Sequence, residues 1–345
     1  MKSFKLYRVL DVPEHSDARK FAENTLPAFT SDGTEVSGWT GYRHLLDRKI
    51  EPDRIFHGGY LHLNLVRAEK KVNPKLLKAE CTMEENVQLE VTGREFLSRK
   101  EKTEIRREVH ARLLKEAAHV LASDELIVDA GTKLLFTTAK SETAADRLAV
   151  HWRFTVGTAL CPWRFEDPCL EKPLTFTPEA SSEEPDINPG ADFLTWLWWW
   201  LEKEQSPNAL TAWGVGDKQI KFSHTCSGAH NVVLSKGCPA KSAEATTCLL
   251  EGKKVMELPL LFADGEQTWE FSLDQALTFK GVRYPDVDGL DEVSRFQEKV
   301  GLMLHLAEAV DALCKVFVDT VITADWETTH VQRFQEWINA RKKTN

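Results

Sequence analysis

The chain has 345 residues, of which 42% are hydrophobic and 28% are charged, a composition typical of a folded protein rather than a disordered one. No segment contains the roughly 18 consecutive apolar residues that a membrane-spanning helix requires. The seven cysteines are scattered at wide spacings, which favours reduced thiols in a cytoplasm over a disulfide framework. We therefore expect a cytoplasmic protein with no membrane partner.

The formal net charge of −9 argues at first sight against a nucleic-acid partner, but the charge is distributed unevenly. Residues 1–153 contain 26 basic and 24 acidic side chains, a net charge of +2, whereas the remaining residues contain 18 and 29, a net charge of −11. The overall charge therefore does not decide whether this chain binds DNA.

Residues 1–163 are predicted to form an N-terminal α+β region. Alternating apolar and polar residues over 60–66 predict a strand whose leucines share one face. An apolar stripe at helical spacing that runs to Val120 predicts a charged helix. In chain order, we expect a strand over 4–10, a helix over 17–24 capped by Ser16, paired strands at 38–40 and 60–66, a helix from Asn73 to Ala79, the charged helix over 96–121, strands over 125–129 and 133–138, and a helix over 142–153.

Residues 164–192 are rich in proline and acidic side chains, which predicts a linker or long loop before a C-terminal α+β region over 193–320. A helical extension over 321–345 ends the chain. In order, we expect a buried helix over 193–201, strands and turns over 211–280 that include strands at 255–262 and 268–272, a long amphipathic helix over 293–317, and a last helix over 331–341. Strands and helices are segregated rather than alternating, so the fold class is α+β.

The sequence contains no phosphate-binding glycine loop and no nucleophile elbow. One pattern is compatible with a Mg²⁺-dependent nuclease: Asp53, then Glu69 and Lys71 two residues apart beyond a strand. In such a site the carboxylates hold the metal and the lysine orients or activates water. The pattern carries little information, however, and a charged, solvated strand end explains the same residues more simply.

Two further clusters have simpler explanations than a ligand site. His224, Cys226 and His230 are zinc-competent residue types, but their spacing fits no paired-cysteine motif, and we expect no metal and no cofactor. Four tryptophans lie within Trp196–Trp200, too close together to share one helical face. They therefore indicate a core or an interface rather than a base-stacking surface.

Six basic residues gather near the start of the charged helix, where they could contact DNA phosphates. Glutamates are interleaved with them, so a mixed, solvent-facing helix remains an alternative. A second basic segment lies at Lys218–Lys221. The six residues of the first cluster are Arg94, Arg99, Lys100, Lys102, Arg106 and Arg107.

Many segments, in order, resemble the recombination-associated protein RdgC family. No single motif is diagnostic, and the likeness extends over most of residues 4–320. The segments that carry it are Phe4–Arg8, Ser37–Trp39, Val66–Lys78, Gly93–Leu114, Glu125–Asp129, Ala139–Asp146, Asp217–Ile220, Lys254–Leu258, Trp269–Phe271 and Phe296–Leu313.

The resemblance implies a multi-domain α+β fold with antiparallel sheets, and a ring-forming homodimer that encircles double-stranded DNA without sequence preference or catalysis. Such a protein is nucleoid-associated and restrains a RecA-type recombinase by occupying DNA. The residues carried over as phosphate contacts are Arg99, Lys100, Lys102, Lys218 and Gln219, followed by Arg94, Arg106 and Arg107.

Three features depart from the family pattern. Lys115–Ala118 stands where the family often has Pro-x-Ala-Phe, so the aromatic residue that helps to close the ring is missing. The acidic segment 164–192 would oppose DNA near it, and 321–345 has no counterpart. A Mg²⁺-dependent nuclease and an acidic protein-interaction module that engages a recombinase through 164–192 therefore stay open as alternatives.

Overall fold

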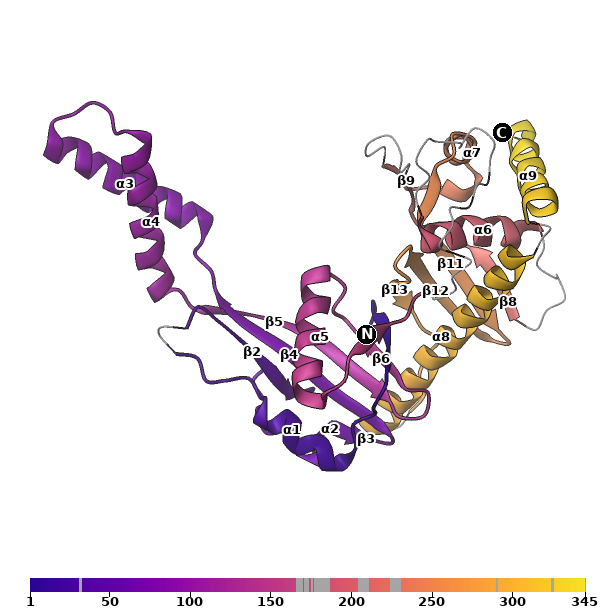
Figure 1. Cartoon of the computed structure of the whole chain (residues 1–345), viewed down its shortest axis with the longest axis horizontal. Helices are drawn as coiled ribbons and strands as arrows, with labels where there is room; N and C mark the ends of the chain where they lie inside the picture. The colour runs from indigo at the N-terminus through magenta and orange to yellow at the C-terminus, as the bar shows by residue number, and fades with distance from the viewer. Residues whose placement is uncertain are drawn as a thin grey trace. The chain divides into compact units, whose positions relative to one another are not determined.

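The computed structural model describes residues 1–30, 33–165, 170, 174, 176, 187–203, 211–223, 231–289, 291–323 and 326–344. The chain forms two compact units (Figure 1). The first, here called the hairpin unit, comprises Val9–Lys133 and Ser141–Leu160. The second, here called the tryptophan unit, comprises Met1–Arg8, Leu134–Lys140 and Cys161–Asn345. The expected region over 1–163 is thus shared between both units, and most of 164–192 lies outside the described residues.

In the antiparallel sheet of the hairpin unit, β4 pairs with β2, β3 and β5. β4 pairs along its whole length with β5, from Tyr60 opposite Asp129 to Lys70 opposite His119, and its other edge pairs with β2. The strands are β2 (Glu35–Gly41), β3 (Phe56–His57), β4 (Tyr60–Lys70) and β5 (His119–Asp129). The helices are α1 (Ala18–Glu23), α2 (Pro52–Ile55), α3 (Pro74–Thr92), α4 (Arg99–Glu116) and α5 (Glu142–Val156).

The core of this unit lies between the sheet and helices α1 and α5. Trp39 of β2 is fully buried against Phe21, which in turn contacts Trp152, and the Trp39 indole N–H donates to Thr155 Oγ1 at 2.8 Å. The leucines of β4 are buried as expected, but His62 and Asn64 on the opposite face are buried too. The strand is therefore covered on both faces, which a simple alternation does not reveal.

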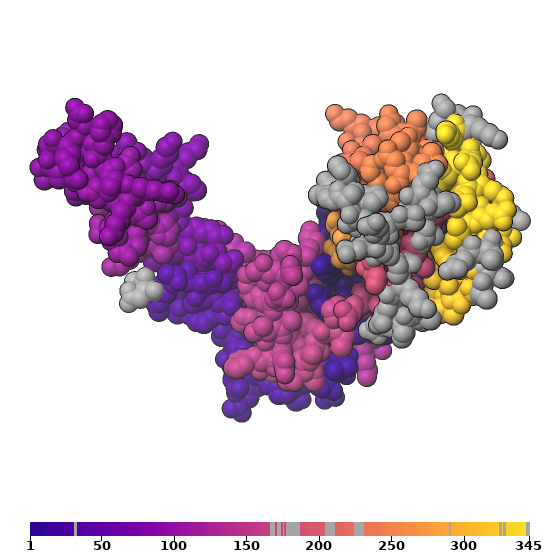
Figure 2. All heavy atoms as spheres, turned by 45° about the horizontal axis from the view of Figure 1, so that its top comes forward, coloured from indigo at the N-terminus to yellow at the C-terminus, as the bar shows by residue number. Residues whose placement is uncertain are grey.

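Helices α3 and α4 form an antiparallel hairpin that extends as a lobe beyond the ends of β4 and β5 (Figures 1 and 2). Asn73 caps α3 and Ser98 caps α4, and Gly93 ends α3 in the left-handed conformation that glycine adopts without strain. The small interhelical core consists of Leu77, Cys81, Ile105 and Val109. Because these four side chains pack between the helices, the other faces of α3 and α4 are exposed to solvent.

A second antiparallel sheet dominates the tryptophan unit, in the order β10-β9-β11-β12-β13 with β8 also on β11. Its strands are β8 (Thr211–Val215), β9 (Ile220–Ser223), β10 (Val232–Leu234), β11 (Lys254–Asp264), β12 (Gln267–Asp274) and β13 (Phe279–Arg283). The other elements are β1 (Lys5–Val9), β6 (Leu134–Thr137), β7 (Leu160–Pro162), α6 (Pro189–Lys203), α7 (Ala243–Leu250), α8 (Glu292–Ile322), η5 (Trp326–His330) and α9 (Val331–Thr344).

Helix α6 lies on this sheet and also packs against α8 and α9, and its tryptophans contact all three. Trp196, Trp198 and Trp199 are buried, and Thr195 Oγ1 accepts a 2.9 Å hydrogen bond from the amide of Val255 in β11. The expectation of a core cluster is therefore confirmed for these three tryptophans. None of the helices in the described part of the chain is long and apolar enough to cross a membrane.

The structure confirms the α+β class with antiparallel sheets and corrects several element boundaries. Asp17, not Ser16, occupies the N-cap position of α1, without a capping hydrogen bond from its side chain. The helix that begins after Asn73 continues to Thr92 instead of ending near Ala79. The charged helix ends at Glu116, so Val120 belongs to β5. Val120 follows the helical spacing of α4, but the pairing of β5 with β4 places it in a strand.

Candidate nucleic-acid interface

A groove of about 1060 Å³ runs between α3 and α4. Its walls carry five cationic side chains and one carboxylate, together with His110. We call it the basic groove. The cations are Lys78, Arg99, Lys102, Arg106 and Arg107, and the carboxylate is Glu85.

Helical spacing places these side chains on one face. Arg99 and Arg106 of α4 are seven residues apart, nearly two full turns, so they project in almost the same direction, with Lys102 between them. Lys78 faces them from α3. A row of positive charge on a helical lobe is suited to the phosphates of a nucleic-acid backbone.

The basic residues predicted from the sequence differ in their ion pairs. Arg99, Lys100 and Arg106 are exposed and form no ion pair with other described residues. Lys102 pairs with Glu85 at 3.4 Å, and Arg107 pairs with Glu104. Arg99, Lys102, Arg106 and Arg107 line the groove, whereas Lys100 does not.

Arg94 is engaged at the start of α4. Its guanidinium contacts Glu101 at 2.7 Å, and Glu101 also accepts hydrogen bonds from the amide and hydroxyl of Ser98. These bonds, that of Arg94 first, lower the pKa of Glu101 to about 2. Arg94 therefore stabilises the helix cap, and the structure does not place it in the groove.

Lys218 and Gln219 belong to the tryptophan unit and contact acidic side chains of their own sheet. Lys218 pairs with Glu270 at 3.1 Å, and the Gln219 amide donates to Glu257 at 3.1 Å. Burial raises the pKa of Glu257, but hydrogen bonds from Lys221, Lys280 and Gln219 outweigh it and leave that pKa below 4.5. Phosphate contact by Lys218 and Gln219 stays a prediction.

The residues of the alternative nuclease site do not converge. Asp53 lies in α2, which leads into β3 beside the first residues of β4, whereas Glu69 lies at the far end of β4. Nine residues of extended strand span about 30 Å. Glu69 instead pairs with Arg67 at 2.7 Å and with Lys71 at 3.1 Å.

The zinc-competent residues His224, Cys226 and His230 lie outside the described residues. Within the described ranges, no group of three or more histidine, cysteine, aspartate or glutamate side chains is placed to hold a metal ion.

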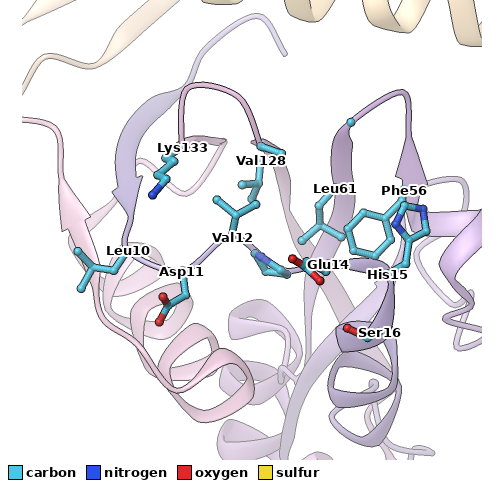
Figure 3. Close-up of a pocket in the computed structure, with 13 residues that line it drawn as sticks. Leu10, Asp11, Val12, Glu14, His15, Ser16, Phe56, Leu61, Val128 and Lys133 are labelled. Carbon is cyan, nitrogen blue, oxygen red and sulfur yellow. The ribbon is translucent and has the colours of Figure 1, made fainter.

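A second cavity in the hairpin unit, of about 690 Å³, is lined by the loops that follow β1, β3 and β5 (Figure 3). Leu61 and Val128 form part of its apolar wall, and His15 stacks on Phe56 at 4.5 Å between ring centroids. Its rim mixes both signs of charge, with Asp11, Glu14 and Lys133. It therefore lacks the charge selectivity of the basic groove.

Sequence reasoning missed Lys78 and Glu85. Both lie on α3, and Glu85 lies beyond the point where that helix was expected to end. The signal is present in the sequence as Asn73-Pro74 followed by an uninterrupted helix-compatible stretch up to Gly93. Only the pairing of α3 with α4, however, places Lys78 and Glu85 in one groove with Arg99 and Lys102.

No protein-family model matches the chain, and no curated protein matches it. The likeness to the RdgC family therefore depends on the sequence segments alone.

Proposed function

We propose that this chain is a non-enzymatic, RdgC-like protein that binds double-stranded DNA without sequence preference as a ring-shaped homodimer. In this proposal it is nucleoid-associated and modulates a RecA-type recombinase by occupying DNA. The observation that carries the proposal is the basic groove, in which five cationic side chains face one carboxylate on an exposed helical lobe.

The groove supports phosphate recognition rather than base reading. Its polar walls are long, flexible lysine and arginine side chains, which contact phosphates in any sequence. Arg99 and Arg106 are available for such contacts because no described carboxylate pairs with them. Binding should therefore be sensitive to salt and insensitive to sequence.

The proposal is tested by measuring the affinity for two unrelated duplexes across a salt series. We expect equal affinities for the two duplexes. In Arg99→Gln/Arg106→Gln, the slope of log K against log salt should fall in magnitude by up to about 1.8, because each lost phosphate contact removes about 0.9. The control is Arg112→Gln/Lys115→Gln, which removes the same charge from α4 outside the groove.

Two results would overturn the proposal. One is absence of binding at low salt, and the other is equal slopes for the groove variant and the control. The same incubations with Mg²⁺, followed by electrophoresis of the DNA, test the non-enzymatic part. Cleavage that disappears in Glu69→Ala would replace it with the nuclease alternative.

A further inference from the structure

Glu85 is the only carboxylate among the described residues that line the basic groove. It lies on α3 and pairs across the groove with Lys102 of α4, with 3.4 Å between Oε2 and Nζ. The side chain of Lys102 is 54% exposed and that of Glu85 is 27% exposed, so both are accessible from the groove. A negative charge therefore occupies one position in a row of cations.

We infer that Glu85 is a built-in competitor that limits the affinity of the groove for DNA; this inference rests on the proposed function. A DNA phosphate that approaches Lys102 has to displace the Glu85 carboxylate from it. The displaced carboxylate then remains close to the phosphate and repels it, since both are negatively charged. Glu85 thus lowers the affinity for DNA in two ways, because its carboxylate pairs with Lys102 and also repels the phosphate.

A purely stabilising role explains Glu85 less well. Exposed ion pairs contribute little to stability, and the hairpin is already held by the apolar core of Leu77, Cys81, Ile105 and Val109. A second interhelical ion pair, Glu80 with Arg112 at 3.1 Å, also joins α3 to α4.

The Glu80–Arg112 pair provides a matched control. Glu80 is five residues from Glu85, about 140° around the helix, and neither Glu80 nor Arg112 lines the groove. Glu80→Gln and Glu85→Gln remove the same charge from the same helix, and each breaks one ion pair between α3 and α4. Only Glu85→Gln changes the groove.

The test compares the wild type, Glu85→Gln and Glu80→Gln for duplex affinity across a salt series. For Glu85→Gln we expect an affinity about three- to tenfold higher at low salt and a slope steeper by about 0.9, because Lys102 gains a phosphate contact. For Glu80→Gln we expect less than a twofold change. In Glu85→Gln/Lys102→Gln the steeper slope should be lost.

The outcomes separate this inference from the proposed function. If the wild type binds in a salt-sensitive manner but Glu85→Gln and Glu80→Gln behave alike, the inference is wrong and the proposed function stands. If the wild type does not bind at low salt, both fall. Circular dichroism spectra of the variants that match the wild-type spectrum show that the hairpin still folds.

Discussion

At the scale of single residues, His62 shows how burial sets protonation in the sheet of the hairpin unit. Its side chain is 7% exposed, Nε2 lies 3.0 Å from Glu125 Oε1, and the ring stacks on Tyr42 at 4.2 Å. Burial lowers the pKa of His62 below 6.5, while the hydrogen bond and charge of Glu125 oppose that shift. The imidazole is therefore neutral at pH 7.

We expect the pKa of His62 to lie below 6.5 and to fall further in Glu125→Gln, because that variant lacks the carboxylate that favours the charged imidazole. Below about pH 6.5 the unfolded chain binds a proton that the folded chain does not, so His62 makes the free energy of unfolding decrease as the pH falls. A histidine NMR titration, assigned with His62→Gln, measures this. A pKa at or above 6.5 would contradict the expectation.

At the scale of elements, helix α9 shows how a terminal segment is fixed to the tryptophan unit. The Arg341 guanidinium lies over the rings of Trp198 and Trp337, 4.9 and 5.2 Å from their centroids, and Nη1 contacts Glu202 at 2.8 Å. Both indole N–H groups donate to the same Glu202 carboxylate at 2.8 Å. Arg341 therefore joins α9 to α6 through the ring of Trp198 and the carboxylate of Glu202, whereas its contact with Trp337 lies within α9.

We expect Arg341→Ala to weaken the docking of α9 by about 2 kcal/mol, because it removes the cation–π contact with Trp198 of α6 and the charged hydrogen bond to Glu202. Hydrogen exchange of the α9 amides should then be roughly thirtyfold faster. The control is Lys342→Ala, at the neighbouring exposed position. Unchanged exchange in Arg341→Ala would show that the remaining apolar contacts alone hold α9.

The elements also show what local sequence can and cannot predict. Asn73-Pro74 marks the start of α3 because capping is a local interaction, and the buried tryptophans of α6 follow from composition. Val120 follows the helical spacing of α4 but pairs with Glu69 of β4, a distant contact that the local pattern does not contain. The groove was missed for the same reason, since it exists only where two helices meet.

At the scale of the whole molecule, a closed ring of two copies needs two interfaces, each self-complementary about the two-fold axis. Ala118, just after the end of α4, stands where the family pattern has an aromatic residue. The last turn of α3 and the loop that follows it nevertheless expose apolar side chains, with Val91 79% and Phe96 81% accessible. Exposed apolar residues of this kind favour association with another surface.

Ring closure has a consequence that simple phosphate contacts do not. A protein that only contacts phosphates dissociates at the same rate from a linear duplex and from a covalently closed circle. A closed ring can slide off the ends of a linear duplex, but it must open to leave a circle. We therefore expect salt-sensitive binding to both DNAs in a gel shift, and slower dissociation from the circle when competitor DNA is added. Cutting the circle with a restriction enzyme should then restore the faster rate. Equal rates before and after cutting would retain the basic groove as the site of contact and exclude a ring that stays closed around DNA.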